Sequence, residues 1–339
     1  MAMESYVFAS RRQGSDTLAS VTNYDIIGDV HGQIEKLTKL LKHLGYREIK
    51  GAYRQEGHTA IFVGDLIDRG SGQLEVLQTV KAMVDAGTAL CVMGNHEFNA
   101  LAYATVKNPM DVDGKIEFCR PHSAKNRHQH EAFLALDAPL RDEWLQWFRT
   151  LPLWLELSDL RVVHACWHEA SMNDVLQAFG EPFLRTNDQI RHATNKKSRA
   201  YHAIETLLKG PELELTDLGI PPFEDKSGHA RQSARISWWL HDDKPHWLLQ
   251  GPKPKKLSKD TMDRLIEAVE PFRYHDTAKP LFFGHYWQTS EHEVALATIG
   301  PNAACVDFSA GRDGELTAYR FVPGQRISRK GYLRESQGS

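Results

Sequence analysis

The chain has 339 residues, of which 41% are hydrophobic and 25% are charged, and it carries a formal net charge of −3. This composition is that of an ordinary globular protein and excludes a fibrous or disordered chain. The small net charge gives no field that would attract nucleic acid, so general nucleic-acid binding is not expected and a polyanionic substrate must be held by a local cluster of cations.

The first hundred residues repeat one pattern three times, namely a short apolar strand, a loop of Gly, Asp, His or Asn, and a helix. The periodicity predicts strands at 24–27, 60–63 and 88–93, and helices at 33–44, 73–84 and 97–103. Such alternation is typical of βαβ units with parallel strands. We therefore expect the three polar loops to lie at one edge of a sheet.

Less regular sequence follows this repeat. Residues 105–150 form a polar stretch rich in histidine and basic residues, which is either a solvated insertion beside the site or a metal-binding loop. A strand is predicted at 160–163, and residues 172–276 mix helical and irregular patterns in what we expect to be a cap-like insertion. Strands resume at 281–283, 303–306 and 316–321. Because single cores stop growing at roughly 250 to 300 residues, we expect one domain over residues 1–339 with these two insertions.

Neither a membrane-spanning segment nor a disulfide framework is indicated. No apolar stretch approaches the roughly 18 to 20 residues that cross a bilayer, so we expect no membrane partner and a cytoplasmic location. The four cysteines are scattered without a CxxC pair. They predict reduced thiols rather than disulfides or a thiolate zinc site.

Polar motifs stand at the ends of the predicted strands. They read GDVHG at 28–32, GDLIDRG at 64–70 and GNHE at 94–97, and two lone histidines, His164 and His285, close later strands. Together they supply carboxylate oxygens, an amide oxygen and imidazoles, which suit divalent manganese, iron or zinc. Because parallel sheets bind ligands outside the carboxyl ends of their strands, these side chains predict a metal site at that edge.

The order GDxHG, GDxxDRG and GNHE resembles that of the calcineurin-like metallophosphoesterase family, and the DRG and GNHE forms resemble its phosphoprotein phosphatase branch. That branch contains protein serine/threonine phosphatases, including bacterial ones, and dinucleoside-tetraphosphatases. The resemblance is dense over 24–103 and continues at His164, His285 and the segment from 306 onward. It implies an α/β fold, the four-layer metallophosphoesterase sandwich of two mixed β-sheets flanked by helices.

The resemblance also implies a site for two divalent metal ions, with Mn²⁺ expected and Fe or Zn as alternatives. The implied ligands are Asp29 and His31 for the first ion, Asp65 as the bridge, and Asn95, His164 and His285 for the second. Two ions that share a water ionise it near neutral pH, so a metal-bridging hydroxide would attack phosphorus. His164 stands in His-Ala-Cys where the family more often has His-Gly-Gly or His-Ala-Gly, so the tight turn after it is in doubt and a core histidine is the alternative. His168 follows four residues later and could fall near His164 on a helical turn, but we expect it to be merely adjacent to His164 and not a ligand.

By the same resemblance, His96 faces the leaving-group oxygen as general acid, while Asp68 accepts its other ring N–H. Arg69 would bind two phosphate oxygens through its planar fork, and Asn95 would also contact phosphate. Taken alone, Asp68 could equally be a loop cap and Arg69 part of a surface ion pair.

Segment 223–239 carries two arginines four residues apart, Arg231 and Arg235. If the segment is helical, they share one face and could reach a phosphate, and a solvated cationic face is the alternative. We expect the Trp238-Trp239 pair to pack in the core or a lid, with a wall for a nucleotide base as the alternative.

The predicted function is therefore dinuclear-metal phosphoester hydrolysis, acting first on phosphomonoesters of proteins or small molecules. Dinucleoside polyphosphate hydrolysis is the alternative, because the motifs contact phosphate and not the group attached to it. A metal-binding scaffold without turnover is the remote alternative. It is remote because the sequence retains His96 and Asp68, and a protein that only binds metal would need no general acid. The expected partner is a phosphorylated protein, small molecule or nucleotide.

Overall fold

The computed structural model describes residues 23–108, 116–224, 230–240, 248–250, 257–288 and 302–335. The strands are β1 Asn23–Ile27, β2 Arg47–Ile49, β3 Ala52–Arg54, β4 His58–Phe62, β5 Ala89–Cys91, β6 Trp154–Glu156, β7 Arg161–Val163, β8 Glu212–Glu214, β9 Phe223–Glu224, β10 Ala230–Arg231, β11 Ser233–Arg235, β12 Leu281–Phe283, β13 Ala303–Cys305, β14 Thr317–Phe321 and β15 Tyr332–Arg334. The helices are α1 Ile34–Leu44, α2 Gln73–Asp85, α3 Asn95–Ala104, α4 Ala124–Gln129, α5 Glu131–Leu134, α6 Ala138–Phe148, α7 Glu169–Phe179, α8 Asn187–Thr194, α9 Arg199–Lys209 and α10 Lys259–Val269, with 3-10 turns η1 Thr216–Leu218, η3 Glu270–Phe272 and η4 Arg329–Gly331.

The first sheet has five strands in the order β15-β14-β1-β4-β5. Strands β1, β4 and β5 are parallel and are joined through α1 and α2, as the βα repeat predicts, whereas β14 and β15 pair antiparallel at one edge. The three predicted strands are confirmed, although the last is shorter than 88–93. The sequence prediction missed the hairpin β2–β3, whose turn residues Lys50 and Gly51 have φ of 53° and 77°.

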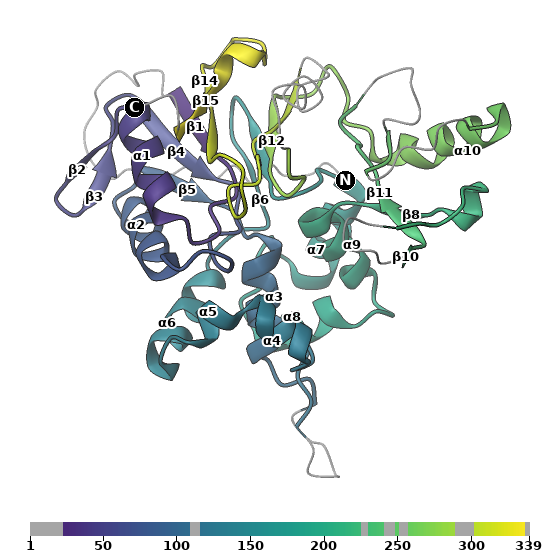
Figure 1. Cartoon of the computed structure of the whole chain (residues 1–339), viewed down its shortest axis with the longest axis horizontal. Coiled ribbons are helices and arrows are strands. Elements are labelled where there is room, and N and C mark those ends of the chain that lie inside the picture. Colours follow the sequence, from purple (N-terminus) through teal and green to yellow (C-terminus); the bar gives the residue numbers. More distant parts are fainter. Residues whose placement is uncertain are drawn as a thin grey trace.

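The second sheet has four strands in the order β13-β12-β7-β6, and only β6 runs antiparallel to its neighbour. Aromatic side chains fill the space between the sheets, since the ring of Phe282 on β12 lies 5.0 Å from Tyr319 and 5.4 Å from Phe321 on β14. Both sheets are mixed and helices flank them, with α1 and α2 on one side of the view and α7, α9 and α10 on the other (Figure 1). The predicted fold class is confirmed.

The two segments predicted as insertions contain regular structure. Residues 105–150 include α4, α5 and α6, and α6 buries Trp144, Leu145, Trp147 and Phe148, while residues 109–115 lie outside the described part. Residues 172–276 include most of α7, then α8, α9, two two-stranded sheets, β8 with β11 and β9 with β10, and α10. Their status as insertions into one domain stays a prediction. Among the helices that the structure describes, none has the length and apolar character required to span a bilayer.

The loop after β1 lies close to the second sheet at Gly28. A Cβ at this position would stand 2.1 Å from the carbonyl oxygen of Val306, directly after β13. Because backbone cannot yield as a flexible side chain does, we expect Gly28→Ala to lower the free energy of unfolding by about 3 kcal/mol. Chemical denaturation measures this loss.

Gly57→Ala is the matched control for this prediction. Gly57 has φ of 69°, but a Cβ there would meet nothing within 4 Å. The strained dihedral alone costs about 1 kcal/mol. An equal loss in the two variants would contradict a steric contact between the sheets at Gly28.

Candidate metal and phosphate site

Loops at the carboxyl ends of five strands, β1, β4, β5, β7 and β12, supply the candidate side chains. Several of these side chains stand on residues with left-handed backbone conformations, which non-glycine residues rarely adopt. The φ values are 47° at His31, 52° at Asp65, 71° at Asp68, 69° at Arg69 and 70° at His285. Such conformations persist only where surrounding structure holds them, and they are concentrated at functional sites.

Two groups of potential metal ligands share one residue, Asp65. His31, Asp65 and His96 form one group, and Asp65, His164 and His285 form the other, with the ligand atoms of each group within 4.8 Å of one another. Oδ2 of Asp65 lies 3.6 Å from Nε2 of His31, whereas Oδ1 lies 3.4 Å from Nε2 of His164. The two carboxylate oxygens therefore face different groups.

Backbone carbonyls orient two of these imidazoles. The ring Nδ1 of His31 lies 2.9 Å from the carbonyl oxygen of Ile67, and that of His164 lies 2.7 Å from the carbonyl oxygen of Val63. Since a carbonyl only accepts, Nδ1 carries a proton in both rings, so the lone pair stands on Nε2 whenever the ring is neutral. Both Nε2 atoms point toward Asp65.

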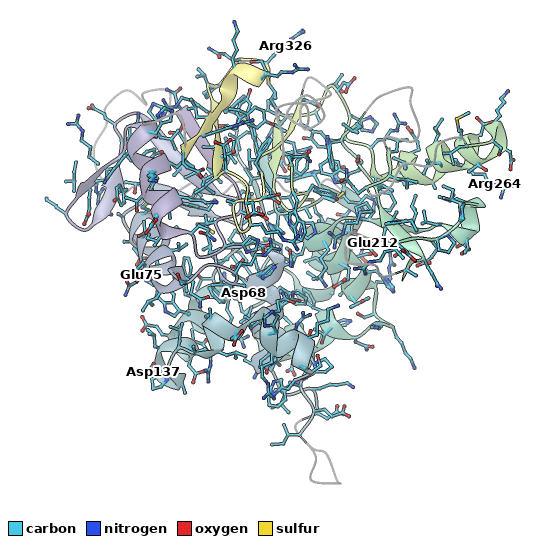
Figure 2. The ribbon with its side chains drawn as sticks, viewed as in Figure 1. Asp68, Glu75, Asp137, Glu212, Arg264 and Arg326 are labelled. Atoms are coloured by element: carbon cyan, nitrogen blue, oxygen red, sulfur yellow. The ribbon has the colours of Figure 1, made fainter. Side chains whose placement is uncertain are left out.

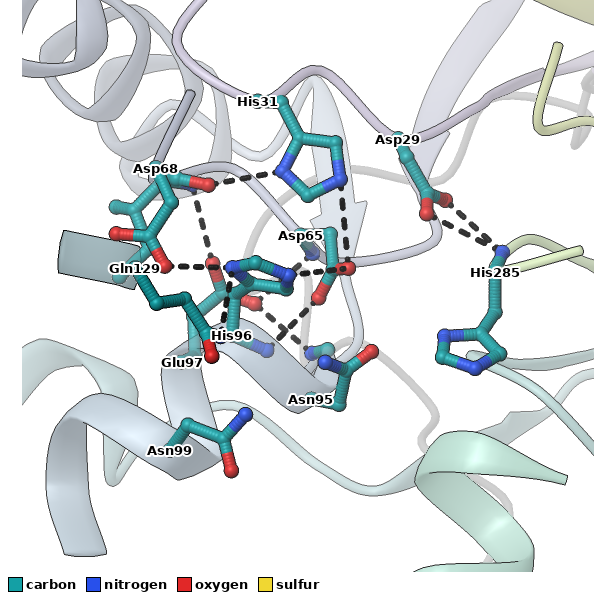
Figure 3. Close-up of polar contacts among 12 residues, drawn as sticks. Asp29, His31, Asp65, Asp68, Asn95, His96, Glu97, Asn99, Gln129 and His285 are labelled. Atoms are coloured by element: carbon teal, nitrogen blue, oxygen red, sulfur yellow. Dashed lines mark hydrogen bonds and ion pairs between the residues drawn. The ribbon is translucent and has the colours of Figure 1, made fainter. Parts of the chain in front are cut away.

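Asp29 and Asn95 lie beside these two groups. Both oxygens of Asp29 accept from the backbone N–H of His285, at 3.3 and 3.2 Å (Figure 3). Oδ1 of Asn95 lies 3.0 Å from Nε2 of His164. All the sequence-predicted ligands thus gather in one buried region, but His31 is grouped with Asp65 and His96 rather than with Asp29.

His96 lies between two carboxylates (Figure 3). Its Nδ1 is 2.5 Å from Oδ2 of Asp68, and its Nε2 is 3.8 Å from Oδ2 of Asp65. Burial alone lowers the pKa of His96, but Asp65 and Asp68 outweigh it and raise the pKa above its ordinary value. The pair His96 and Asp68 therefore has the geometry expected of a carboxylate-oriented imidazole.

His130 is a second partner of Asp68 that the sequence reasoning missed. Its Nδ1 lies 2.8 Å from Oδ2 of Asp68, and the residue is 1% exposed although it belongs to the polar stretch at 105–150. The solvated interpretation of that stretch is therefore wrong at His130. His130 is the N-cap of α5 and stands three residues before the buried Phe133. This spacing is the one hint in the sequence that His130 is buried.

Glu97 is another functional residue that the motif alone did not assign. Its carboxylate is fully buried and accepts the backbone N–H groups of Asp65, Leu66 and Gly94 at 2.9, 2.8 and 3.0 Å. It thereby fastens the loop after β4 to the loop after β5. Burial is the largest cause that raises the pKa of Glu97 to about 7, followed by the charge of Asp65.

Arg69 is exposed at the edge of the site, and its Cζ lies 4.6 Å from the ring centroid of Trp287. Arg231 and Arg235 lie on strands β10 and β11, so the helical arrangement considered for them is wrong. Arg235 forms an ion pair with Glu212 at 3.2 Å, and its charge contributes to lowering the pKa of His285. Arg231 is exposed.

The remaining sequence predictions have clear outcomes. Trp238 and Trp239 are 0% and 1% exposed, so they pack in the core and cannot form a wall for a base.

Nδ1 of His168 bonds to Oγ of Ser171 at 2.8 Å, and His168 lies outside both ligand groups among the described residues. After His164, the turn without glycine is held by the N–H of Ala165, which donates to the carbonyl of Leu207 at 3.0 Å.

The family model for the calcineurin-like phosphoesterases matches residues 23–251, which is well over half of the chain. The chain belongs to this family. The predicted family and the predicted enzyme class, metal-dependent phosphoric ester hydrolase, are thereby confirmed at the level of the family.

Two curated relatives of this calcineurin-like phosphoesterase carry related names. The asymmetrical bis(5'-nucleosyl)-tetraphosphatase PrpE of Halalkalibacterium halodurans is 49% identical over 74 residues, which is 22% of this chain and 30% of that protein. A symmetrical bis(5'-nucleosyl)-tetraphosphatase of Vibrio cholerae is 34% identical over 145 residues, which is 43% of this chain and 44% of that protein. The chain thus spans less than half the length of each. Among solved structures, a protein serine/threonine phosphatase of Saccharomyces cerevisiae covers 93% of this chain and 79% of its own, with 14% identity and a TM-score of 0.43.

The residues present fit divalent metal ions. Nε2 of His31 and Nε2 of His285 are buried and have no hydrogen-bond partner among the residues that the structure describes. A buried polar atom without a partner costs free energy that coordination would offset. Imidazole nitrogens beside the Asp65 carboxylate are the donor set that manganese, iron or zinc accepts.

Burial and charge set different protonation states in the metal-free site. Burial, followed by His96, lowers the pKa of His31 to about 3, and burial also lowers the pKa of His285 well below its usual value. Burial alone would raise the pKa of Asp65, but His164 and His96 outweigh it and keep the carboxylate ionised. Burial alone would lower the pKa of His164, but Asp65 outweighs it and raises the pKa to about 10.

These states predict proton release when metal binds. Near neutral pH, His31 and His285 are already neutral, whereas His164 must lose its proton before it can coordinate an ion. We expect at least one proton to leave per protein, because burial also raises the pKa of the proposed ligand Asp29, and we expect metal affinity to rise with pH below pH 10. Calorimetric Mn²⁺ titrations in buffers of different ionisation enthalpy measure the released proton.

The control for this titration is His128→Gln, because the His128 side chain is 86% exposed and lies outside both ligand groups. It should release as many protons as the unmodified protein. Metal binding without proton release, in a protein with all its ligands intact, would contradict a protonated His164.

Proposed function

We propose that this chain hydrolyses phosphoric esters with two divalent cations held between the loops after β1, β4, β5, β7 and β12. The observation that carries the proposal is the Asp65 carboxylate, which turns one oxygen toward His31 and the other toward His164. The proposed ligands are Asp29, His31, Asp65, Asn95, His164 and His285, with Mn²⁺ expected and Fe or Zn as alternatives. When bound, such ions activate water and polarise the phosphoryl oxygens.

Arg69 is the proposed phosphate clamp. Its guanidinium is exposed beside the ligand groups and forms no hydrogen bond or ion pair with the residues that the structure describes. A planar guanidinium without a carboxylate partner suits two phosphoryl oxygens. The Asn95 amide is a further phosphate contact, and the proposed additional cation is Arg235, whose charge acts on His285, or Arg231.

His96 is the proposed general acid. Asp68 fixes the tautomer by accepting from Nδ1, which leaves Nε2 for the leaving-group oxygen. The raised pKa of His96 favours the protonated imidazole, which can donate its proton as the ester bond breaks. The competing role is metal coordination, since His96 shares a ligand group with His31 and Asp65.

Two substrate classes fit this site. Phosphomonoesters of proteins or small molecules need only one phosphoryl group in contact with Arg69 and the metal ions. Dinucleoside polyphosphates are the second candidate, and the names of the two tetraphosphatase relatives favour them. A phosphoprotein partner and a cytoplasmic location stay predictions.

The proposed function is tested first on Asp65. The unmodified protein should release p-nitrophenol from p-nitrophenyl phosphate faster when Mn²⁺ is added, and Asp65→Asn should reduce this rate more than about 100-fold while lowering metal content. Asp142→Asn, at an exposed position on α6 outside the site, is the matched control. An active and fully metallated Asp65→Asn variant would refute the bridging role, and no metal-stimulated release by the unmodified protein would favour the inactive scaffold.

A second test separates the two roles of His96. His96→Asn should retain metal and lose roughly 10²- to 10⁴-fold in rate on alkyl phosphates, because a poor leaving group needs the proton. The loss should be smaller on p-nitrophenyl phosphate, whose leaving group is stable as an anion. A uniform loss across leaving groups, or a loss of bound metal, would contradict the acid role.

A further inference from the structure

Trp287 is a large apolar side chain that remains 39% exposed at the edge of the site, two residues after His285. Two guanidinium groups lie over its ring. The Cζ of Arg69 is 4.6 Å from the ring centroid, and the Cζ of Arg312 is 4.3 Å from it. A tryptophan face attracts cations through its quadrupole, so the ring holds both arginines near one position.

The loop that carries Arg312 is fastened to the backbone of Trp287. The buried carboxylate of Asp307 accepts the backbone N–H of Trp287 and that of Ser309, each at 2.9 Å. The N–H of Arg312 donates to the carbonyl of Ser309 at 2.9 Å. One buried carboxylate therefore fixes both the aromatic ring and the second arginine.

A lysine from helix α1 closes the same loop. Nζ of Lys36 donates to the carbonyl oxygens of Ala310 and Gly314, at 2.9 and 2.6 Å. These two hydrogen bonds hold Ala310 and Gly314, which lie on either side of Arg312 in the sequence. The backbone that presents the guanidinium is thus ordered before any ligand arrives, which reduces the entropy lost on binding.

The loop also lies against the metal and phosphate site. A Cβ at Gly311 would stand 2.7 Å from Cδ2 of His31 and 2.8 Å from Cδ of Arg69. The residue before Arg312 therefore touches a proposed metal ligand and the proposed phosphate clamp. Arg312 therefore follows a residue that lies against the proposed phosphate clamp.

The two guanidinium groups over Trp287 have no direct carboxylate partner within the described part of the chain. Arg69 and Arg312 are both exposed, and neither guanidinium forms a hydrogen bond or ion pair within the described part of the chain. Asp307 is occupied by its backbone N–H groups beneath the loop. Two neighbouring cations repel each other, and an anion with adjacent charged groups would relieve this repulsion while bonding to both.

We infer that Arg312, held on Trp287, binds the phosphoryl group next to the one that Arg69 holds, and so selects substrates with a phosphate chain over simple monoesters. This inference rests on the proposed function, because it takes the first phosphoryl position from Arg69. The ligand class is a nucleoside or dinucleoside polyphosphate. Arg312 is a specificity-determining residue for such a substrate.

The test compares Arg312→Gln with the unmodified protein on diadenosine tetraphosphate and on p-nitrophenyl phosphate, both with Mn²⁺. The ratio of the two kcat/KM values should fall about 10- to 100-fold, because a charge-assisted hydrogen bond to one phosphoryl group is lost. Arg312→Lys keeps the charge without the planar fork and should restore part of this ratio. Equal losses on both substrates, or an unchanged ratio, would overturn the inference.

Arg326→Gln is the matched control, because Arg326 is also an exposed arginine but lies at the periphery of the molecule, far from Asp68 (Figure 2). Arg326→Gln should leave the ratio of the two kcat/KM values unchanged from that of the unmodified protein. A fall as large as that in Arg312→Gln would mean that any lost surface charge lowers the ratio, which also overturns the inference.

A binding measurement distinguishes failure of this inference from failure of the proposed function. Absence of Mn²⁺-stimulated turnover of either substrate by the unmodified protein defeats the proposed function. In that case, titration calorimetry with manganese tripolyphosphate and with inorganic phosphate still tests Arg312. Selective weakening of tripolyphosphate binding in Arg312→Gln supports the second phosphoryl position, and equal affinities in the two proteins defeat it.

Discussion

The site depends on one buried carboxylate that several groups share. Asp65 has a left-handed backbone, its N–H donates to Glu97, and its Oδ1 accepts the backbone N–H of His96 at 2.9 Å. Its oxygens also face imidazoles from the loops after β1 and β7. A charge buried without such partners would cost several kcal/mol, so Asp65 is tolerable only while these loops converge on it.

The fold makes that convergence possible because parallel strands end together. Strands β1, β4 and β5 of one sheet, and β7 and β12 of the other, all deliver their following loops to the same region. The family match over residues 23–251 covers the first four of these loops. Function in this architecture resides in loop side chains, while the strands and their aromatic packing keep those loops in register.

The sequence predicted the parts of this arrangement that local patterns encode. Short apolar runs followed by amphipathic helices identified the strands before Asp29, Asp65 and Asn95, and the βα alternation placed their loops at one edge. Contacts between distant segments were not predictable in this way. His130 meets Asp68 across 62 residues of chain, and no periodicity in a polar stretch indicates which histidine turns inward. The i,i+4 spacing of Arg231 and Arg235 suggested a helix, but pairing with β9 and β8 determined the conformation.

The contact between His130 and Asp68 has a consequence for the segment from α4 to α5. These helices have six and four residues, too few to be stable in isolation, so their order depends on packing such as that of Phe133 against Phe148. Whenever that packing opens, Asp68 loses one of its two imidazole partners, and water gains access to a carboxylate that is otherwise enclosed. Opening of this helical segment would therefore change the hydrogen bonding of Asp68 in the candidate site.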